Sequence, residues 1–149
     1  MRISAGFIIS LFVLFSLCCH RHGEIILDQV ADLPEYFSEN YRFGRDIKSI
    51  EELNECILIT GKIDTTTEVP PLRLAVINID HKRIFLTLRK STVTENGINE
   101  RYSGNGYSLD LNFRENKVKN HSPIYEGYLT LEGDNSKSEY NIVGTTGYY

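Results

Sequence analysis

The chain holds few of the side chains that perform chemistry in proteins. It has four histidines and three cysteines, and none of them is spaced as in a metalloprotease, hydrolase, phosphate-loop or Cys-x-x-Cys motif. His20 and His22 could bind a metal weakly, but a solvated segment accounts for the same spacing. Its acidic residues follow turn and surface patterns, where carboxylates are ordinarily solvated. We therefore expect no metal, no cofactor and no enzymatic activity.

Two of the cysteines end an apolar N-terminal segment. Arg2 is followed by an apolar run that stops at Cys18 and Cys19. The run is shorter than the roughly 20 residues that a membrane-spanning helix needs, so we interpret residues 1–18 as a cleaved signal of the lipoprotein type. Cys19 is the predicted acylation site and Cys18 the alternative. Ordinary secretion without a lipid is the competing interpretation.

The lipoprotein interpretation predicts where the chain resides. Several acyl chains on the N-terminal cysteine hold a protein on a membrane essentially permanently. We expect the mature chain to be anchored in a bacterial cell envelope, on the outer membrane, with the periplasmic and surface faces both open as alternatives.

The third cysteine, Cys56, opens the apolar run Cys-Ile-Leu-Ile. A thiol in such surroundings is expected to be buried and unreactive. Because Cys56 is the only cysteine beyond the signal, a disulfide in the mature domain would need Cys18 or Cys19 as its partner. The fold is therefore expected to depend on its hydrophobic core.

Length limits the number of domains, and net charge limits the kinds of partner. About 130 residues follow the signal, enough for one domain with one core. The formal net charge is -4, so we expect no basic face for nucleic acid.

The mature chain divides into two parts of different pattern. Residues 19–54 are rich in charge and have no sustained period, which predicts a tether that partly docks. Ser49 and Glu52 have the spacing of a capping box and predict a short helix near 49–54. Residues 55–149 show a period of two, which predicts a β domain.

Apolar residues alternate with polar ones in several runs of the β domain, separated by turn sequences. One face is expected to hold Tyr107, Leu109, Leu111 and Phe113. Further alternating runs are Ile57, Ile59 and Ile63; Leu72, Leu74 and Val76; and Ile84, Leu86 and Leu88. Turns are predicted at 80–83, 96–97, 104–106, 115–117 and 133–136. Six to eight hairpin-linked strands would close into a small antiparallel barrel or a compact sandwich.

One connection between these runs is stiff. Three threonines, a valine and two prolines favour extended backbone before any partner binds, which lowers the entropic cost of docking into a cleft. The reactive-loop candidates are Thr65, Thr66, Thr67, Glu68, Val69 and Pro70. A long hairpin connection with edge prolines is the plainer interpretation. A second candidate is the segment 91–101, with its Asn-Gly turn.

A family resemblance rests on the whole architecture. A signal that ends in cysteine, a charged tether and a barrel closing with Tyr125-Glu-Gly-Tyr-Leu-Thr-Leu and Tyr140-Asn-Ile-Val-Gly resemble the potempins, small bacterial lipoproteins that inhibit secreted peptidases. The resemblance implies an OB-fold-like architecture for the all-β barrel, to which the capping-box spacing adds a short N-terminal helix. It implies a secreted metallopeptidase or serine peptidase as partner, blocked by a loop inserted into its active-site cleft. An immunity lipoprotein that neutralises a toxin, and an envelope ligand-binding or assembly module, are the rival functions.

Overall fold

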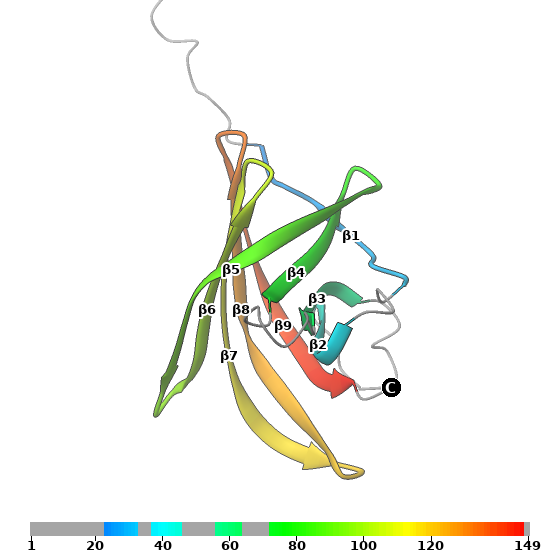
Figure 1. Ribbon diagram of the computed structural model, residues 1–149, viewed down its shortest axis with the longest axis vertical. Helices are drawn as coiled ribbons and strands as arrows, with labels where there is room; N and C mark the ends of the chain where they lie inside the picture. The colour runs from blue at the N-terminus through cyan, green and yellow to red at the C-terminus, as the bar shows by residue number, and fades with distance from the viewer. Residues whose placement is uncertain (1–22, 33–36, 46–55, 64–71, 148–149) are drawn as a thin grey trace, which may run out of the picture.

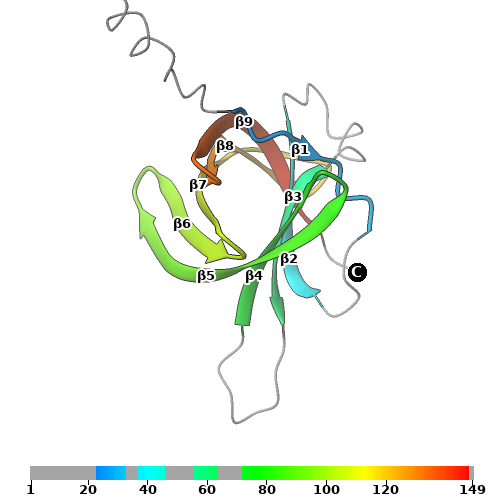
Figure 2. The same cartoon turned by 90° about the horizontal axis from the view of Figure 1, so that it is seen from above.

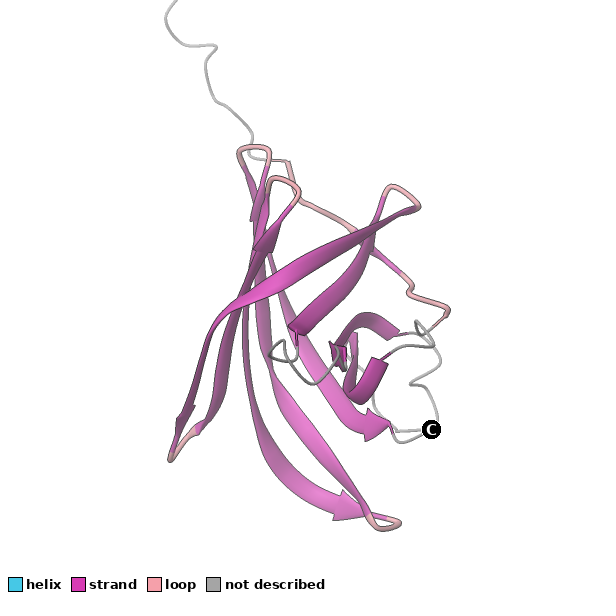
Figure 3. Cartoon of the chain, viewed as in Figure 1, coloured by secondary structure: helices cyan, strands magenta, loops and turns pink. Residues whose placement is uncertain are grey.

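Nine β-strands make up most of residues 23–32, 37–45, 56–63 and 72–147, the part of the chain described by a computed structural model. The strands are β1 (Leu27–Asp28), β2 (Phe37–Arg45), β3 (Cys56–Ile63), β4 (Leu72–Ile79), β5 (Lys82–Thr94), β6 (Gly97–Gly104), β7 (Tyr107–Lys119), β8 (Ser122–Gly133) and β9 (Ser136–Gly147). None of these described residues forms a helix (Figures 1 and 3). The all-β prediction is confirmed. The predicted signal, 1–18, and the predicted helix near 49–54 lie outside the described residues.

Strands β2 to β9 form a closed antiparallel barrel. Each pairs with the next strand along the chain, and β9 returns to pair with β2 (Figure 2). The short β1 adds to β4 on the same side as β3, with Leu27 opposite Ile79. The predicted antiparallel barrel is therefore confirmed. Its eight strands follow an up-and-down order, whereas an OB fold has five strands in a Greek key, so the OB-like strand order is corrected.

Two-residue turns join most neighbouring strands. In four of them both central residues have positive φ, the backbone that a tight hairpin requires; they are Asp80–His81, Asn105–Gly106, Asn120–His121 and Asp134–Asn135. The turns predicted at 80–83, 96–97, 104–106 and 133–136 are confirmed. The turn predicted at 115–117 is wrong, because Asn116 forms a β-bulge there and β7 continues to Lys119.

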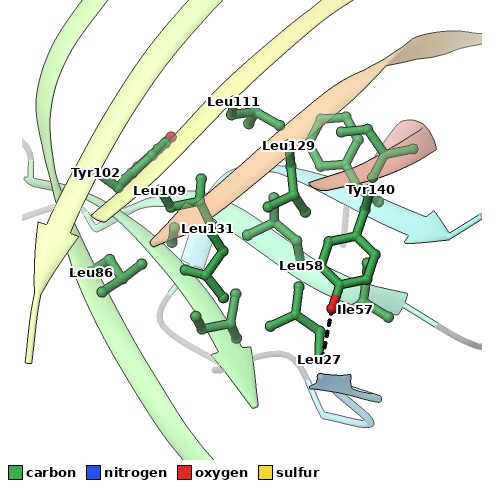
Figure 4. Packing of buried hydrophobic residues seen from close by; sticks show 14 of the residues in the cluster. Leu27, Ile57, Leu58, Leu86, Tyr102, Leu109, Leu111, Leu129, Leu131 and Tyr140 are labelled. Atoms are coloured by element: carbon green, nitrogen blue, oxygen red, sulfur yellow. Dashed lines mark hydrogen bonds between the residues drawn. The ribbon is translucent and has the colours of Figure 1, made fainter. Parts of the chain in front are cut away.

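Large apolar side chains fill the barrel interior (Figure 4). The predicted inward face of β7 is confirmed, because Leu109, Leu111 and Phe113 are at most 1% exposed. Leu86 and Leu129 point into the same cluster and are fully buried. The interior of the described barrel is thus a packed core, which argues against the barrel interior as a ligand-binding surface.

Strands β3 and β4 are buried on both of their faces. Their register places Ile59 and Val76 opposite each other, on the face away from Leu58. These outward side chains pack with Val30 and Phe37 in a second apolar cluster. The alternating run Ile57, Ile59 and Ile63 of β3 therefore does not lie on a single core face: Ile57 belongs to the main cluster, whereas Ile59 packs in the second cluster with residues of the N-terminal segment.

That N-terminal segment falls within the predicted tether, 19–54. The structure places Leu27–Asp28 and Phe37–Arg45 in the sheet, so these parts of the range belong to the barrel domain and its boundary at residue 55 is corrected. Two register shifts interrupt the alternating pattern of β2, so the strand is not recognisable from the sequence. An extra residue at Glu39, whose φ is 42°, turns Phe37 to the outer face while Phe43 points inward. A bulge breaks the period of two.

The two ends of the barrel differ. One end, here called the plugged end, carries the turns 80–81, 105–106 and 134–135 (Figure 1). The buried Ile25 and Leu27 join the core at this end, and Figure 4 shows Leu27 next to Tyr140. Ile25 N–H donates to Ser138 Oγ at 2.6 Å, and Leu27 N–H donates to the Tyr140 hydroxyl at 3.3 Å. The other end, here called the far end, carries the turns 95–96 and 120–121.

Candidate functional site

The predicted reactive loop, Thr65 to Pro70, lies outside the described residues. Its flanking strands do show where it begins and ends. Ile63 and Leu72 are register partners at the ends of β3 and β4. Because connections in an up-and-down barrel alternate between its ends, these flanks lie at the far end, together with the turns 95–96 and 120–121.

Two hairpins project at this far end (Figure 1). In the β5–β6 hairpin, every residue of β5 from Arg89 to Thr94 is exposed. In the β7–β8 hairpin, every residue of β7 from Arg114 to Lys119 is exposed. The β5–β6 hairpin includes the second loop candidate, 91–101, which the structure shows as two paired strands.

Local hydrogen bonds support the tip of one hairpin and the stem of the other. In the first, the Thr94 hydroxyl donates to the Gly97 carbonyl at 3.2 Å and accepts the Asn96 N–H at 3.3 Å. In the second, the amide of the bulged Asn116 donates to the Glu126 carboxylate in the paired stem. These bonds are in place before any partner arrives, which lowers the entropic cost of docking.

Exposed aliphatic side chains mark the far end. Val93 on β5 is 77% exposed, Val118 on β7 is 62% exposed and Leu72 at the start of β4 is 42% exposed. Each lies on a different strand. From the sequence, Leu72 was predicted only as part of an alternating run and Val93 only as part of the segment 91–101, and Val118 was not predicted to have a role. For Val118 a usable signal exists, since it is a lone apolar residue between two lysines.

A polar cluster lies just inside the far end. The Glu100 carboxylate is 2% exposed; it accepts from Arg73 Nη1 at 2.9 Å and from the Tyr102 hydroxyl at 2.6 Å. Burial, and then the neighbouring Glu100 charge, raise the pKa of Tyr102, so this phenol stays protonated and donates. Both carboxylate oxygens are therefore occupied, and the cluster is suited to holding β4 against β6 rather than to acid–base chemistry.

Aromatic rings surround this cluster. Tyr41, Phe113 and Tyr125 meet edge to face with ring centroids 5.2 to 5.6 Å apart, and the Arg73 guanidinium lies 6.0 Å from the Tyr41 ring centroid. Such edge-to-face contacts restrict side-chain movement. The core at the far end is therefore tightly packed next to the projecting hairpins.

The other candidate chemical groups are separate from one another. The Cys56 thiol is buried, its Sγ lies 3.0 Å from the Leu58 carbonyl, and burial raises its pKa to about 11. This confirms the expected buried thiol. His81 occupies a turn at the plugged end, with Nδ1 3.6 Å from Asp28. Within the described ranges, no three His, Cys, Asp or Glu side chains gather as a metal site.

Membrane attachment was expected through a lipid on Cys19, or alternatively Cys18. Both cysteines lie outside the described residues. Among the residues that are described, no helix has the length and apolar character to cross a bilayer.

Comparison of the chain with protein-family models, with curated proteins and with solved structures finds no significant match.

Proposed function

We propose that this protein is a membrane-tethered inhibitor of exported endopeptidases, and that it docks onto its target through the far end of the barrel. The observation that carries the proposal is the set of exposed aliphatic side chains on strands at that end, Val93, Val118 and Leu72. A peptidase cleft binds extended, apolar-bearing segments, so a pre-ordered hairpin or loop tip is a suitable plug.

The position of the N-terminal segment supports this orientation. Gly23 lies beside the β8–β9 turn at the plugged end, since a Cβ built on it would be 3.5 Å from Ser136 Oγ. An acyl group on Cys19, only a few residues earlier, would keep the plugged end near the membrane. The 13 residues of β7 extend roughly 40 Å along the strand. The far end would then project away from the membrane, towards soluble partners.

The proposed target, an exported metallopeptidase or serine peptidase, rests on the sequence architecture and the predicted loop, Thr65 to Pro70. The flanks of that loop, Ile63 and Leu72, are at the same end as both projecting hairpins. The proposed docking surface therefore takes in this end of the barrel, where the flanks of the loop and the two hairpins lie. Metallopeptidases and serine peptidases both remain within the proposal, because both accept an extended segment in a cleft.

The direct test is titration of the purified protein against a panel of exported metallo- and serine peptidases. We expect stoichiometric inhibition of at least one, weakened about tenfold or more by Val93→Asp, Val118→Asp or Val69→Asp. Ile26→Asp is the matched control, because Ile26 is 64% exposed but lies at the plugged end. Absence of inhibition across the panel, or equal loss with Ile26→Asp, contradicts the proposal.

Membrane attachment is tested separately. Palmitate labelling in cells is expected to disappear when Cys18→Ala and Cys19→Ala are combined, and to survive Cys18→Ala alone. Labelling that persists in the double variant would show that the N-terminal cysteines do not carry the lipid.

A further inference from the structure

The outer face of the barrel carries a groove that is centred at Tyr128 on the side of the barrel and whose lining reaches the far-end turn at Asn96. Three neighbouring hollows lie over strands β5 to β9, with volumes of about 370, 470 and 450 Å³, and Tyr128 borders all three. We call this feature the outer groove. Hollows of this size are in the range that small ligands occupy.

Tyr128 is the centre of the outer groove. Tyr128 is 54% exposed, whereas Leu129 and Leu131 on the same strand are fully buried in the core. The strand register places Asn112 of β7 on one side of Tyr128 and Asn141 of β9 on the other. An aromatic ring thus sits on a rigid sheet between two amide side chains.

The walls of the groove are polar and balanced in charge. Arg101 and Asp110 form a two-pronged ion pair at 2.5 and 3.0 Å, and the Asn112 amide donates to Asn99. The lining holds the basic Lys90, Arg101 and Arg114 and the acidic Glu100, Asp110, Glu126 and Glu139. Because the buried Glu100 is already paired with Arg73, three basic groups face three acidic ones. Such a lining favours a neutral ligand with many hydroxyl groups over an anion.

We propose that the outer groove binds a neutral, linear oligosaccharide, with Tyr128 as the surface on which one sugar ring stacks. Sugar hydroxyls both donate and accept hydrogen bonds, as the flanking asparagine amides do. The C–H face of a sugar ring suits the exposed face of a tyrosine, whose hydroxyl stays in water. The three hollows share Tyr128 on their borders and together give room for more than one sugar beside that ring.

An extended peptide is a poorer fit for the same groove. Strands β6, β7 and β8 are paired on both sides along it, so their backbone groups are already satisfied. A peptide could not add over these three strands as a further strand, which is the usual source of affinity for extended segments. In the described sheet, β5 from Arg89 to Thr94 pairs with β6 alone, so along the groove a peptide strand could add only at that edge, away from Tyr128. The groove also offers few apolar pockets for side chains.

The test is titration of the purified protein with neutral oligosaccharides of four to six sugars, namely β-1,4-linked glucose, β-1,4-linked N-acetylglucosamine and α-1,4-linked glucose. Binding is followed by calorimetry and by amide NMR shifts. We expect at least one to bind, with Tyr128→Ala weakening it about tenfold and Tyr128→Phe by less than about threefold. Val118→Ala at the far end is the control and is expected to leave the affinity unchanged.

The proposal is overturned if none of these saccharides binds at millimolar concentration, or if Tyr128→Ala leaves their affinity intact. Recovery of an extended peptide in the groove instead of a saccharide also overturns it. Tyr128→Ala is expected to retain peptidase inhibition, because Tyr128 lies on the side of the barrel. The saccharide and peptidase proposals therefore fail or succeed independently.

Discussion

Replacing Tyr140 with phenylalanine removes one oxygen atom at the plugged end, where the N-terminal segment meets the barrel. The Tyr140 hydroxyl accepts the Leu27 N–H at 3.3 Å and donates to the Ile25 carbonyl. Both residues are 8% exposed, so water has little access to the two backbone groups that the change would leave without a partner. The substitution therefore tests whether these bonds hold the segment in place.

The expected cost follows from those two bonds. Each intramolecular hydrogen bond contributes about 1 kcal/mol net, and a buried backbone group left unpaired costs about 1–3 kcal/mol. One of the bonds is long, so we expect Tyr140→Phe to lower the free energy of unfolding by about 2 kcal/mol. For a domain of this size that corresponds to a fall in Tm of roughly 6–10 °C.

The measurement is chemical denaturation followed by circular dichroism, together with hydrogen exchange of the Leu27 amide. Tyr128→Phe is the matched control, because that ring is 54% exposed and its change is expected to stay within about 0.5 kcal/mol. Ser138→Ala removes the acceptor of the Ile25 N–H. If the segment detaches as a unit, the double variant with Tyr140→Phe costs less than the sum of the single changes.

A Tyr140→Phe variant as stable as Tyr128→Phe, with unchanged exchange at Leu27, would refute this reasoning. It would mean that the apolar contacts of Ile25 and Leu27 alone secure the plugged end.

Three further predictions concern the barrel. Arg73→Met leaves the buried Glu100 carboxylate without its cationic partner. Because the Arg73 side chain is itself 29% exposed, we expect the free energy of unfolding to fall by about 2 kcal/mol, less than for a fully buried ion pair. Adding Glu100→Gln should restore most of this loss in denaturant titration, and no restoration would contradict the role of the pair. At Gly127 an added Cβ would lie 1.9 Å from the Asn112 carbonyl oxygen, so Gly127→Ala should prevent folding or cost several times as much stability as Gly106→Ala. At Gly106 an added Cβ meets open space, but the φ of +82° makes the expected cost about 1 kcal/mol. Circular dichroism and expression yield compare the two variants, and equal stability would disprove the clash. Burial raises the pKa of Cys56 from an ordinary value near 9 to about 11, so its neutral form stabilises the fold fully below pH 9, and this contribution is lost as the pH rises through 11. Against Cys56→Ala, the parent protein should therefore lose stability selectively between about pH 9 and 11, and parallel pH profiles would count against the shift.

Much of the fold is predictable from local patterns. In β7 the alternation of Leu109, Leu111 and Phe113 with polar residues specifies both a strand and its inward face, because successive side chains of a strand point to opposite sides. Turns such as Asn105–Gly106 carry residues that adopt positive φ readily. These are properties of neighbouring residues and need no knowledge of the rest of the chain.

Other elements were hidden because their pattern depends on distant partners. The bulge at Glu39 breaks the period of β2, and only its pairing with β3 and β9 shows that the segment is a strand. Ile59 resembles a core residue in the sequence, yet it faces outward under Val30. The sequence around Asn116 likewise predicts a turn, and only the pairing of β7 with β8, where Asn116 contacts Glu126, shows that it is a bulge.

The same distinction, between what local sequence patterns predict and what distant pairing decides, applies to the candidate surfaces. The sequence by itself determined that the chain is a β protein with a core of alternating apolar residues, an unreactive Cys56 and no recognisable catalytic motif, since these follow from composition and short-range spacing. Only the tertiary structure decided that Val93 and Val118 project at one end and that Tyr128 borders the hollows on the outer face. The physical reason is that strand register and barrel closure join residues far apart in the chain, and exposure is set by which of them meet.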